Sequence, residues 1–338
     1  PEAGRQAVAR LMGAAASEVS FMGGLRGSFQ LTLMALAQGY PERKHVIIGP
    51  TEHPTWLQFV ESQRRLGLRV TVAALDDRGQ LDTAGMMAAI GPDTLLVSVG
   101  WVSPDTGAVA PIAELGAEVR RRGTFFHTNA AAGLGYLALD LTDMAVDLMT
   151  FSGPSIGGPE RVGGLYVRGD TDLGGFVRQE ARRYESVHGA ALAGMGVAAD
   201  LAGARFPDAI AALTRSRDRL EQTVMRLIPG VIRLGPPGAG RAPHLAAWAF
   251  EGIHAGALAD WLGLAGFRLV PTALCERAQP LPLGIEALRL SPAHKFGTVT
   301  IGLPFGVADG LIDELAAAMQ TAVTRLRQRS PVARHLLG

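Results

Sequence analysis

Short apolar segments alternate with helix-like segments over the first half of this 338-residue chain. Apolar runs of a few residues that are bounded by turn-forming residues are typical of buried strands. We place strands at residues 45–48, 69–74, 94–99, 124–127, 147–151 and 164–167. Helical spacing occurs at residues 5–12, 31–38, 56–66 and 112–122. Because strands that alternate with helices pair into a sheet covered on both faces, the pattern predicts an α/β fold with a parallel or mixed sheet.

The last third of the chain has a different pattern of predicted elements, which starts with a long charged helix. We expect helices at residues 209–227, 255–264 and 308–329, and strands at residues 244–250, 269–270 and 299–301. Helices and strands mixed in this way indicate a second, smaller α+β domain. We therefore predict a large domain over residues 1–208 and a small C-terminal domain over residues 209–338.

The composition is that of a globular protein with a sizeable core, because 48% of the residues are hydrophobic and 19% are charged. The 32 basic and 31 acidic residues give a net charge of +1, so no charge excess points to nucleic acid or to an acidic membrane surface. No apolar run reaches the roughly 18 residues of a membrane span. One cysteine excludes an internal disulfide and is compatible with a reducing compartment. We expect a cytoplasmic protein that binds neither nucleic acid nor membranes.

A glycine-rich segment at residues 152–167 carries the most specific motif of the chain and reads SGPSIGGPERVGGLYV. It resembles the cofactor-lysine segment of class V aminotransferases, most closely that of cysteine desulfurases, whose pattern is Ser-Gly-His-Lys-x-x-Gly-Pro-x-Gly-(Ile/Val)-Gly-x-Leu-Tyr-Val. Further matches are TEH at 51–53, DTLLVS at 93–98 and DLMTFSG at 147–153. The likeness runs nearly from end to end.

This resemblance implies a fold type I pyridoxal-phosphate transferase. Such a protein has a large domain with a mostly parallel seven-stranded sheet and a small α+β C-terminal domain. It also implies a dimer whose active sites lie at the interface, formed with itself or with a related chain. The family's N-terminal segment, with its Ala-Thr-Thr loop, has no counterpart in this sequence.

The residue that the family uses to attach its cofactor is replaced. Pro154 stands where the pattern has the histidine, and Ser155 stands where it has the lysine that forms a Schiff base with pyridoxal phosphate. A serine hydroxyl cannot form an imine, so covalent attachment at this position is excluded. The chain has only two lysines, Lys44 and Lys295, and we interpret both as surface residues.

Other cofactor and substrate positions also depart from the family. His53 matches the histidine that stacks on the pyridine ring. Residues 127–132 read HTNAAA, so Asn129 replaces the aspartate that keeps the ring nitrogen protonated, and Ala132 replaces a glutamine. The arginine that grips the substrate carboxylate corresponds to Thr300.

The family's phosphate cup corresponds to residues 23–27, which read GGLRG. The threonine of the cup is gone, but backbone N–H groups and Arg26 still attract an anion at a helix N-terminus. We expect a vestigial cofactor pocket formed by Gly24, Arg26, His53, Asn129, Ser152 and Ser155. From these replacements we expect no bound cofactor, and the eight histidines show no spacing that indicates a metal site.

The cysteine of the chain, Cys275, lies roughly where the desulfurase loop holds the cysteine that accepts sulfur. It is a candidate persulfide site, with Arg277 beside it to lower the thiol pKa. The alternative interpretation is an apolar, partly buried cysteine, since the surrounding segment departs from the family's Ser-Gly-Ser-Ala-Cys.

These observations lead to three functional hypotheses. The first is a degenerate cysteine desulfurase-like protein that has lost pyridoxal-phosphate catalysis and acts as a binding subunit in sulfur or iron–sulfur metabolism or in a biosynthetic complex, with a sulfur-transfer protein as an expected partner. The second is a pyridoxal-phosphate desulfurase or lyase that works in an unusual way. The third is a persulfide carrier that uses Cys275.

Overall fold

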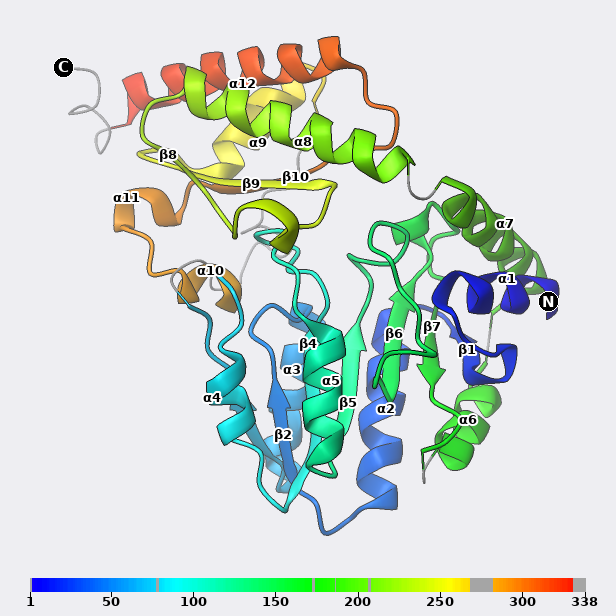
Figure 1. Ribbon diagram of the computed structural model, residues 1–338. Coiled ribbons are helices and arrows are strands. Elements are labelled where there is room, and N and C mark those ends of the chain that lie inside the picture. The colour runs from blue at the N-terminus through cyan, green and yellow to red at the C-terminus, as the bar shows by residue number, and fades with distance from the viewer. Residues whose placement is uncertain are drawn as a thin grey trace. The chain divides into compact units, whose positions relative to one another are not determined.

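The computed structural model in Figure 1 describes residues 2–330 except 77–78, 172–173, 186, 206–207 and 268–281. The chain forms two compact units. The first contains residues 1–74, 81–102 and 110–206, and the second contains residues 75–80, 103–109 and 207–338. The predicted domain boundary after residue 208 stays a prediction, and two short segments from the first half of the sequence group with the second unit.

The first unit holds seven strands and the helices around them. The strands are β1 (Val19–Met22), β2 (His45–Ile48), β3 (Arg69–Val72), β4 (Thr94–Gly100), β5 (Phe125–Asn129), β6 (Leu148–Ser152) and β7 (Gly163–Val167). The α-helices are α1 (Glu2–Met12), α2 (Leu25–Gly39), α3 (Pro54–Ser62), α4 (Thr83–Ala88), α5 (Ile112–Arg121), α6 (Gly174–Arg183) and α7 (Gly189–Arg205). Short 3₁₀ turns are η1 (Ala16–Glu18), η2 (Gln63–Leu66) and η3 (Pro154–Ile156).

The seven strands form one mostly parallel sheet in the order β1-β7-β6-β5-β4-β2-β3. Strands β3, β2, β4, β5 and β6 pair in parallel, whereas β7 runs antiparallel to both β6 and β1. The predicted fold class is therefore confirmed. Every residue of β2, β4 and β7 is buried, which explains why these strands are mainly apolar in sequence.

Two neighbouring residues of β5 show how the sheet is covered on both faces. Phe125 packs against the core that α2 and α3 share with the sheet, while Phe126 lies against Gly116 of α5. Successive strand residues point to opposite faces, so α2 and α3 cover one face and α5 covers the other. His127 and Asn129 follow Phe125 at steps of two and lie on the α2–α3 face.

Helix α7 was not predicted from the sequence, and its packing shows why. Its sequence, GAALAGMGVAADLAGAR, is apolar nearly all round and has no helical period to detect. The helix packs closely on α1: a Cβ added to Gly196 would lie 2.6 Å from Cα of Gly4. Small residues at this contact let the two backbones approach each other.

The second unit contains a three-stranded antiparallel sheet in the order β10-β9-β8. Its strands are β8 (Val231–Arg233), β9 (Leu245–Phe250) and β10 (Thr298–Gly302). Its α-helices are α8 (Asp208–Leu227), α9 (Ala255–Leu264), α10 (Leu283–Ala287), α11 (Pro292–Lys295) and α12 (Asp309–Arg329), with a 3₁₀ turn η4 (Gly238–Gly240). The predicted strand at 269–270 lies outside the described residues. Within the described ranges, no helix is both long enough and apolar enough to cross a membrane.

Candidate functional site

One edge of the large sheet gathers most of the candidate residues. His53 follows the carboxyl end of β2, while Asn129 and Ser152 are the last residues of β5 and β6. Parallel strands bring their carboxyl ends to the same edge, which is where α/β proteins bind ligands. Strand β1 ends at this edge as well, because Met22 and Ser152 are both paired with Gly163 of β7. The structure thus brings the predicted pocket residues of the first unit to one edge.

A buried hydrogen-bond network lies beneath this edge, and its centre is Ser98 of β4. The Ser98 hydroxyl donates to Oε1 of Glu52 at 2.8 Å. The Ser98 hydroxyl oxygen also accepts a hydrogen bond from Nε1 of Trp56 at 2.8 Å, and it lies 2.8 Å from Nδ1 of His127. All four side chains are buried. Sequence reasoning noted Glu52 and His127 only as parts of motifs, and it did not identify the network.

The hydroxyl proton of Ser98 determines the tautomer of His127. When Glu52 is ionised and accepts that proton, the ring donates its Nδ1–H to Ser98. The other ring nitrogen, Nε2, then accepts from the Thr150 hydroxyl at 3.2 Å. Burial lowers the pKa of His127 to about 3, so the ring stays neutral at ordinary pH.

Asn129 is tied to the same network by both ends of its amide. Its Nδ2 donates to Oε2 of Glu52 at 3.2 Å, and its Oδ1 accepts from the backbone N–H of Ala131 at 3.0 Å. The side chain is only 8% exposed. Asn129 therefore lies where a ring-facing carboxylate was expected, but its amide is engaged by the protein.

Glu52 is the acid of this site. Burial raises the pKa of its carboxyl to about 7, and the hydrogen bonds from Ser98 and Asn129 oppose that rise. The site consequently contains a carboxyl that changes its protonation near neutral pH and that is hydrogen-bonded to the Asn129 amide.

The turn at the start of α2 is open, as the sequence predicted. Gly24 is the N-cap of the helix at φ 120°, and a Cβ added there would meet nothing within 4 Å. The first turn of α2 has no acidic residue. Arg26 is exposed, and no side chain in the described part of the chain pairs with it. Free N–H groups, the helix dipole and one guanidinium suit a phosphate.

Ser155 lies in the 3₁₀ turn after β6 and is half-buried. Its hydroxyl donates to the backbone carbonyl of Ser152 at 2.5 Å. This bond closes the turn locally. An oxygen at this position offers no amine for an aldehyde, so the structure adds no means of covalent attachment.

Arg161 occupies the next turn of the same motif, where the desulfurase pattern has glycine. Its φ is 58°, in the left-handed region that non-glycine residues rarely adopt. The side chain is exposed. The mismatch between Arg161 and the pattern's glycine was visible in the sequence, but only the backbone angle shows that it carries strain.

The remaining candidates make contacts outside this network. His53 is exposed and caps α3, with its Nδ1 accepting from the backbone N–H of Thr55 at 3.2 Å. Thr300 belongs to the second unit and donates to the carbonyl of Asp105 at 2.6 Å. Lys44 is exposed, and Lys295 lies 3.9 Å from Glu286. Cys275 lies outside the described residues. Within the described segments, no group of three or more His, Cys, Asp or Glu side chains is placed to hold a metal ion.

Comparison with known proteins identifies relatives over nearly the whole chain. Residues 1–269 match the aminotransferase class-V family. A cysteine desulfurase from Nostoc sp. is 30% identical over 334 residues, covering 97% of this chain and 83% of its own length. A cysteine desulfurase from Klebsiella pneumoniae is 30% identical over 336 residues, covering 98% and 83%. A solved NifS-like protein superposes with a TM-score of 0.85 at 21% identity, covering 96% and 87% of the two chains.

The expectation of no cofactor is wrong in the light of these relatives. They are cysteine desulfurases, which depend on pyridoxal phosphate, and they point to pyridoxal phosphate as the cofactor. The open turn at Gly24 fits the phosphate group, whereas Ser155 cannot attach the aldehyde. The replacements do not exclude non-covalent binding, because phosphate recognition depends on backbone groups that they leave intact. By its sequence and its fold, the chain belongs to the aminotransferase class V family and is related to the cysteine desulfurases.

Proposed function

We propose that this protein is a cysteine desulfurase-like subunit that forms no Schiff base at residue 155 and acts by binding rather than by desulfurating cysteine. One observation carries the proposal: the turn that should present a lysine presents Ser155, whose hydroxyl is bonded to the carbonyl of Ser152. The family relationship supports a role in sulfur or iron–sulfur metabolism or in a biosynthetic complex, and we propose a cytoplasmic location.

Pyridoxal phosphate, where it is bound, supplies an electron sink to the family's reactions. In this chain the N–H groups after Gly24 and the Arg26 guanidinium would hold its phosphate. The ring of His53, which is exposed at the same sheet edge, would stack on the pyridine as the family's histidine does. We propose that these contacts bind the cofactor non-covalently, so that it can be removed by dialysis.

Asn129 supports the loss of catalysis independently of Ser155. An amide carries no charge, so it cannot hold a protonated pyridine nitrogen as a carboxylate does. Both ends of the Asn129 amide are also engaged, by Glu52 and by the backbone of Ala131. The attachment residue and the ring partner are therefore both changed.

Sulfide release from cysteine tests this proposal. We expect the wild-type protein, supplied with pyridoxal phosphate and a reductant, to release no more sulfide than free pyridoxal phosphate does. Ser155→Lys alone should restore little turnover, because groups that act as a unit contribute non-additively. Saturable, cysteine-dependent sulfide release by the wild type would contradict the proposal and favour a desulfurase that works in an unusual way.

We also propose that the chain forms a dimer, either with itself or with a competent related chain. Helix α7 supports this, because Val197 and Leu201 stand one turn apart and are 60% and 50% exposed. Exposed apolar surface of this kind is a common feature of protein interfaces. Light scattering should give twice the 35.5 kDa chain mass at micromolar concentration, and Leu201→Glu should lower it. A single-chain mass for the wild type would contradict self-association.

A further inference from the structure

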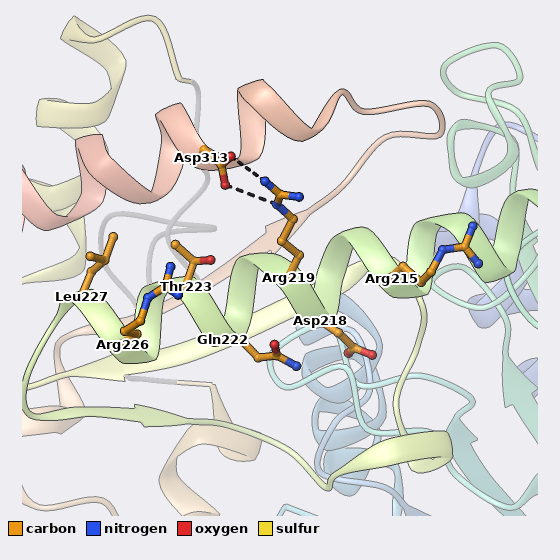
Figure 2. Close-up of a pocket in the computed structure, with 8 residues that line it drawn as sticks. All are labelled: Arg215, Asp218, Arg219, Gln222, Thr223, Arg226, Leu227 and Asp313. Atoms are coloured by element: carbon orange, nitrogen blue, oxygen red, sulfur yellow. Dashed lines mark hydrogen bonds and ion pairs between the residues drawn. The ribbon is translucent and has the colours of Figure 1, made fainter.

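A groove of about 700 Å³ lies between α8 and α12 in the second unit. Figure 2 shows its wall of long polar side chains, most of them from α8. Arg215, Arg219, Gln222 and Arg226 are spaced at i, i+4, i+7 and i+11, so these four positions share one face of the helix. All four side chains are exposed.

The middle of this face carries no free positive charge, because Arg219 is paired with carboxylates of α12. Arg219 reaches across to α12, where it bonds Asp313 at 2.6 Å (Figure 2). It also bonds Asp309 of the same helix at 3.1 Å. Because two carboxylates face one guanidinium, the centre of the groove has a net negative charge. The Asp218 carboxylate beside it is held by Arg217 at 2.7 Å.

The two ends of the face keep their positive charge. Arg215 and Arg226 lie on either side of Arg219 along α8 (Figure 2). Among the residues that the structure describes, neither has an ion-pair partner. The face therefore presents two cationic ends and an anionic centre.

The helix sets the separation of the two ends. Eleven residues at about 1.5 Å each place Arg215 and Arg226 about 16 Å apart along the helix axis. An extended peptide covers this distance in about five residues, at roughly 3.3 Å per residue.

We propose that this groove docks an acidic segment of a partner protein, in which two acidic clusters about five residues apart flank a basic residue. The clusters would pair with Arg215 and Arg226, and the basic residue would face Asp309 and Asp313. Charge complementarity of this kind gives specificity and a faster association rate. The proposal deepens the partner role given above, and it is tested without any measurement of desulfurase activity.

The same charges disfavour nucleic acid. A phosphate backbone carries closely and regularly spaced negative charges, which would meet the two aspartates at the centre of the groove. Separated acidic clusters avoid that repulsion. Binding of RNA is therefore an outcome that would overturn the proposal.

The test uses two labelled peptides of identical composition. In Glu-Glu-Gly-Lys-Gly-Glu-Glu the acidic pairs are five residues apart, whereas in Glu-Glu-Glu-Glu-Gly-Lys-Gly they are contiguous. We expect fluorescence anisotropy at low ionic strength to show tighter binding of the first peptide, and added salt to weaken it. Arg215→Glu with Arg226→Glu should weaken that binding by about tenfold or more.

A matched control reverses two exposed cations of the first unit, Lys44→Glu with Arg65→Glu, and makes the same change in net charge. It should retain binding within about twofold, since only screened long-range charge is altered. Arg215→Gln with Arg226→Gln gives a milder variant, and thermal unfolding of each protein checks that it folds. The proposal fails if the control loses as much affinity as the α8 variants. It also fails if the contiguous peptide or a single-stranded RNA binds as tightly as the spaced peptide.

Discussion

Asn129 donates a hydrogen bond from Nδ2 to Oε2 of Glu52 at 3.2 Å, and both side chains are buried at the carboxyl edge of the large sheet. Glu52 also accepts from the Ser98 hydroxyl, so each of its oxygens has a donor. Glu52 is therefore a buried carboxyl whose two oxygens are both engaged by protein groups.

Glu52 should make stability fall as the pH rises. The folded-state pKa is about 7, above the ordinary value of 4.5. Between these values the unfolded chain releases a proton that the folded chain keeps, so stability is lost progressively with pH. Above pH 7 the loss is complete and on the order of 3 kcal/mol. In Glu52→Gln this contribution is absent, so the variant's unfolding free energy relative to wild type should rise between about pH 4.5 and 8.

Urea unfolding at several pH values measures this difference, and the exposed Glu42→Gln serves as control. The unfolding free energy of Glu52→Gln is compared with that of the wild type at each pH, because other buried groups that titrate contribute equally to both proteins. Burial lowers the pKa of His127 to about 3, which makes stability rise with pH at the acidic end. A constant offset between Glu52→Gln and wild type across the range would show that Glu52 keeps an ordinary pKa.

Arg161→Gly should stabilise the protein. A non-glycine residue in the left-handed region costs about 1–2 kcal/mol, and the extra freedom of glycine in the unfolded chain takes back about 0.5–1 kcal/mol. The net gain is therefore about 0.5 kcal/mol, to be read from denaturant midpoints. Arg161→Ala keeps the same backbone strain and should give no gain. An equal gain in both variants would place the effect in the side chain and not in the φ of 58°.

The fold could be predicted further than the site, for reasons visible in particular elements. Three strands, β2, β4 and β7, are buried along their whole length. Buried positions select apolar residues, and those residues predicted the strands. α7 is buried against α1 by small residues and leaves no period in the sequence. Sequence periodicity reveals one-sided burial only where polar residues fill the exposed face, and the exposed face of α7 carries apolar residues such as Val197 and Leu201.

The site depends on contacts between distant parts of the chain. The motif match singled out Asn129 and Ser155 from the sequence, and the structure places Asn129 at the end of β5 and Ser155 just after β6. Glu52 and Ser98 are 46 residues apart, and the pairing of β2 with β4 brings their segments together. No local pattern encodes that contact or the pKa that follows from it.

Arg26→Ala should weaken anion binding at the start of α2. The wild-type turn combines free N–H groups, the helix dipole and one exposed guanidinium, which favours millimolar binding of inorganic phosphate. Removal of the charge should cost about two- to fivefold in Kd. Thermal unfolding over a phosphate titration measures this, with the exposed Arg65→Ala as control. Superimposable curves for wild type and Arg26→Ala, with and without phosphate, would show that the turn binds no anion.

The absence of a covalent cofactor bond in the wild type is the central claim, and borohydride reduction tests it directly. The protein is incubated with one equivalent of pyridoxal phosphate, reduced, digested and analysed by mass spectrometry, with Ser155→Lys as the positive control. We predict no stoichiometric pyridoxyl adduct on the wild type and one on the peptide that contains residue 155 in the variant. A stoichiometric adduct on Lys44 or Lys295 of the wild type would contradict the account.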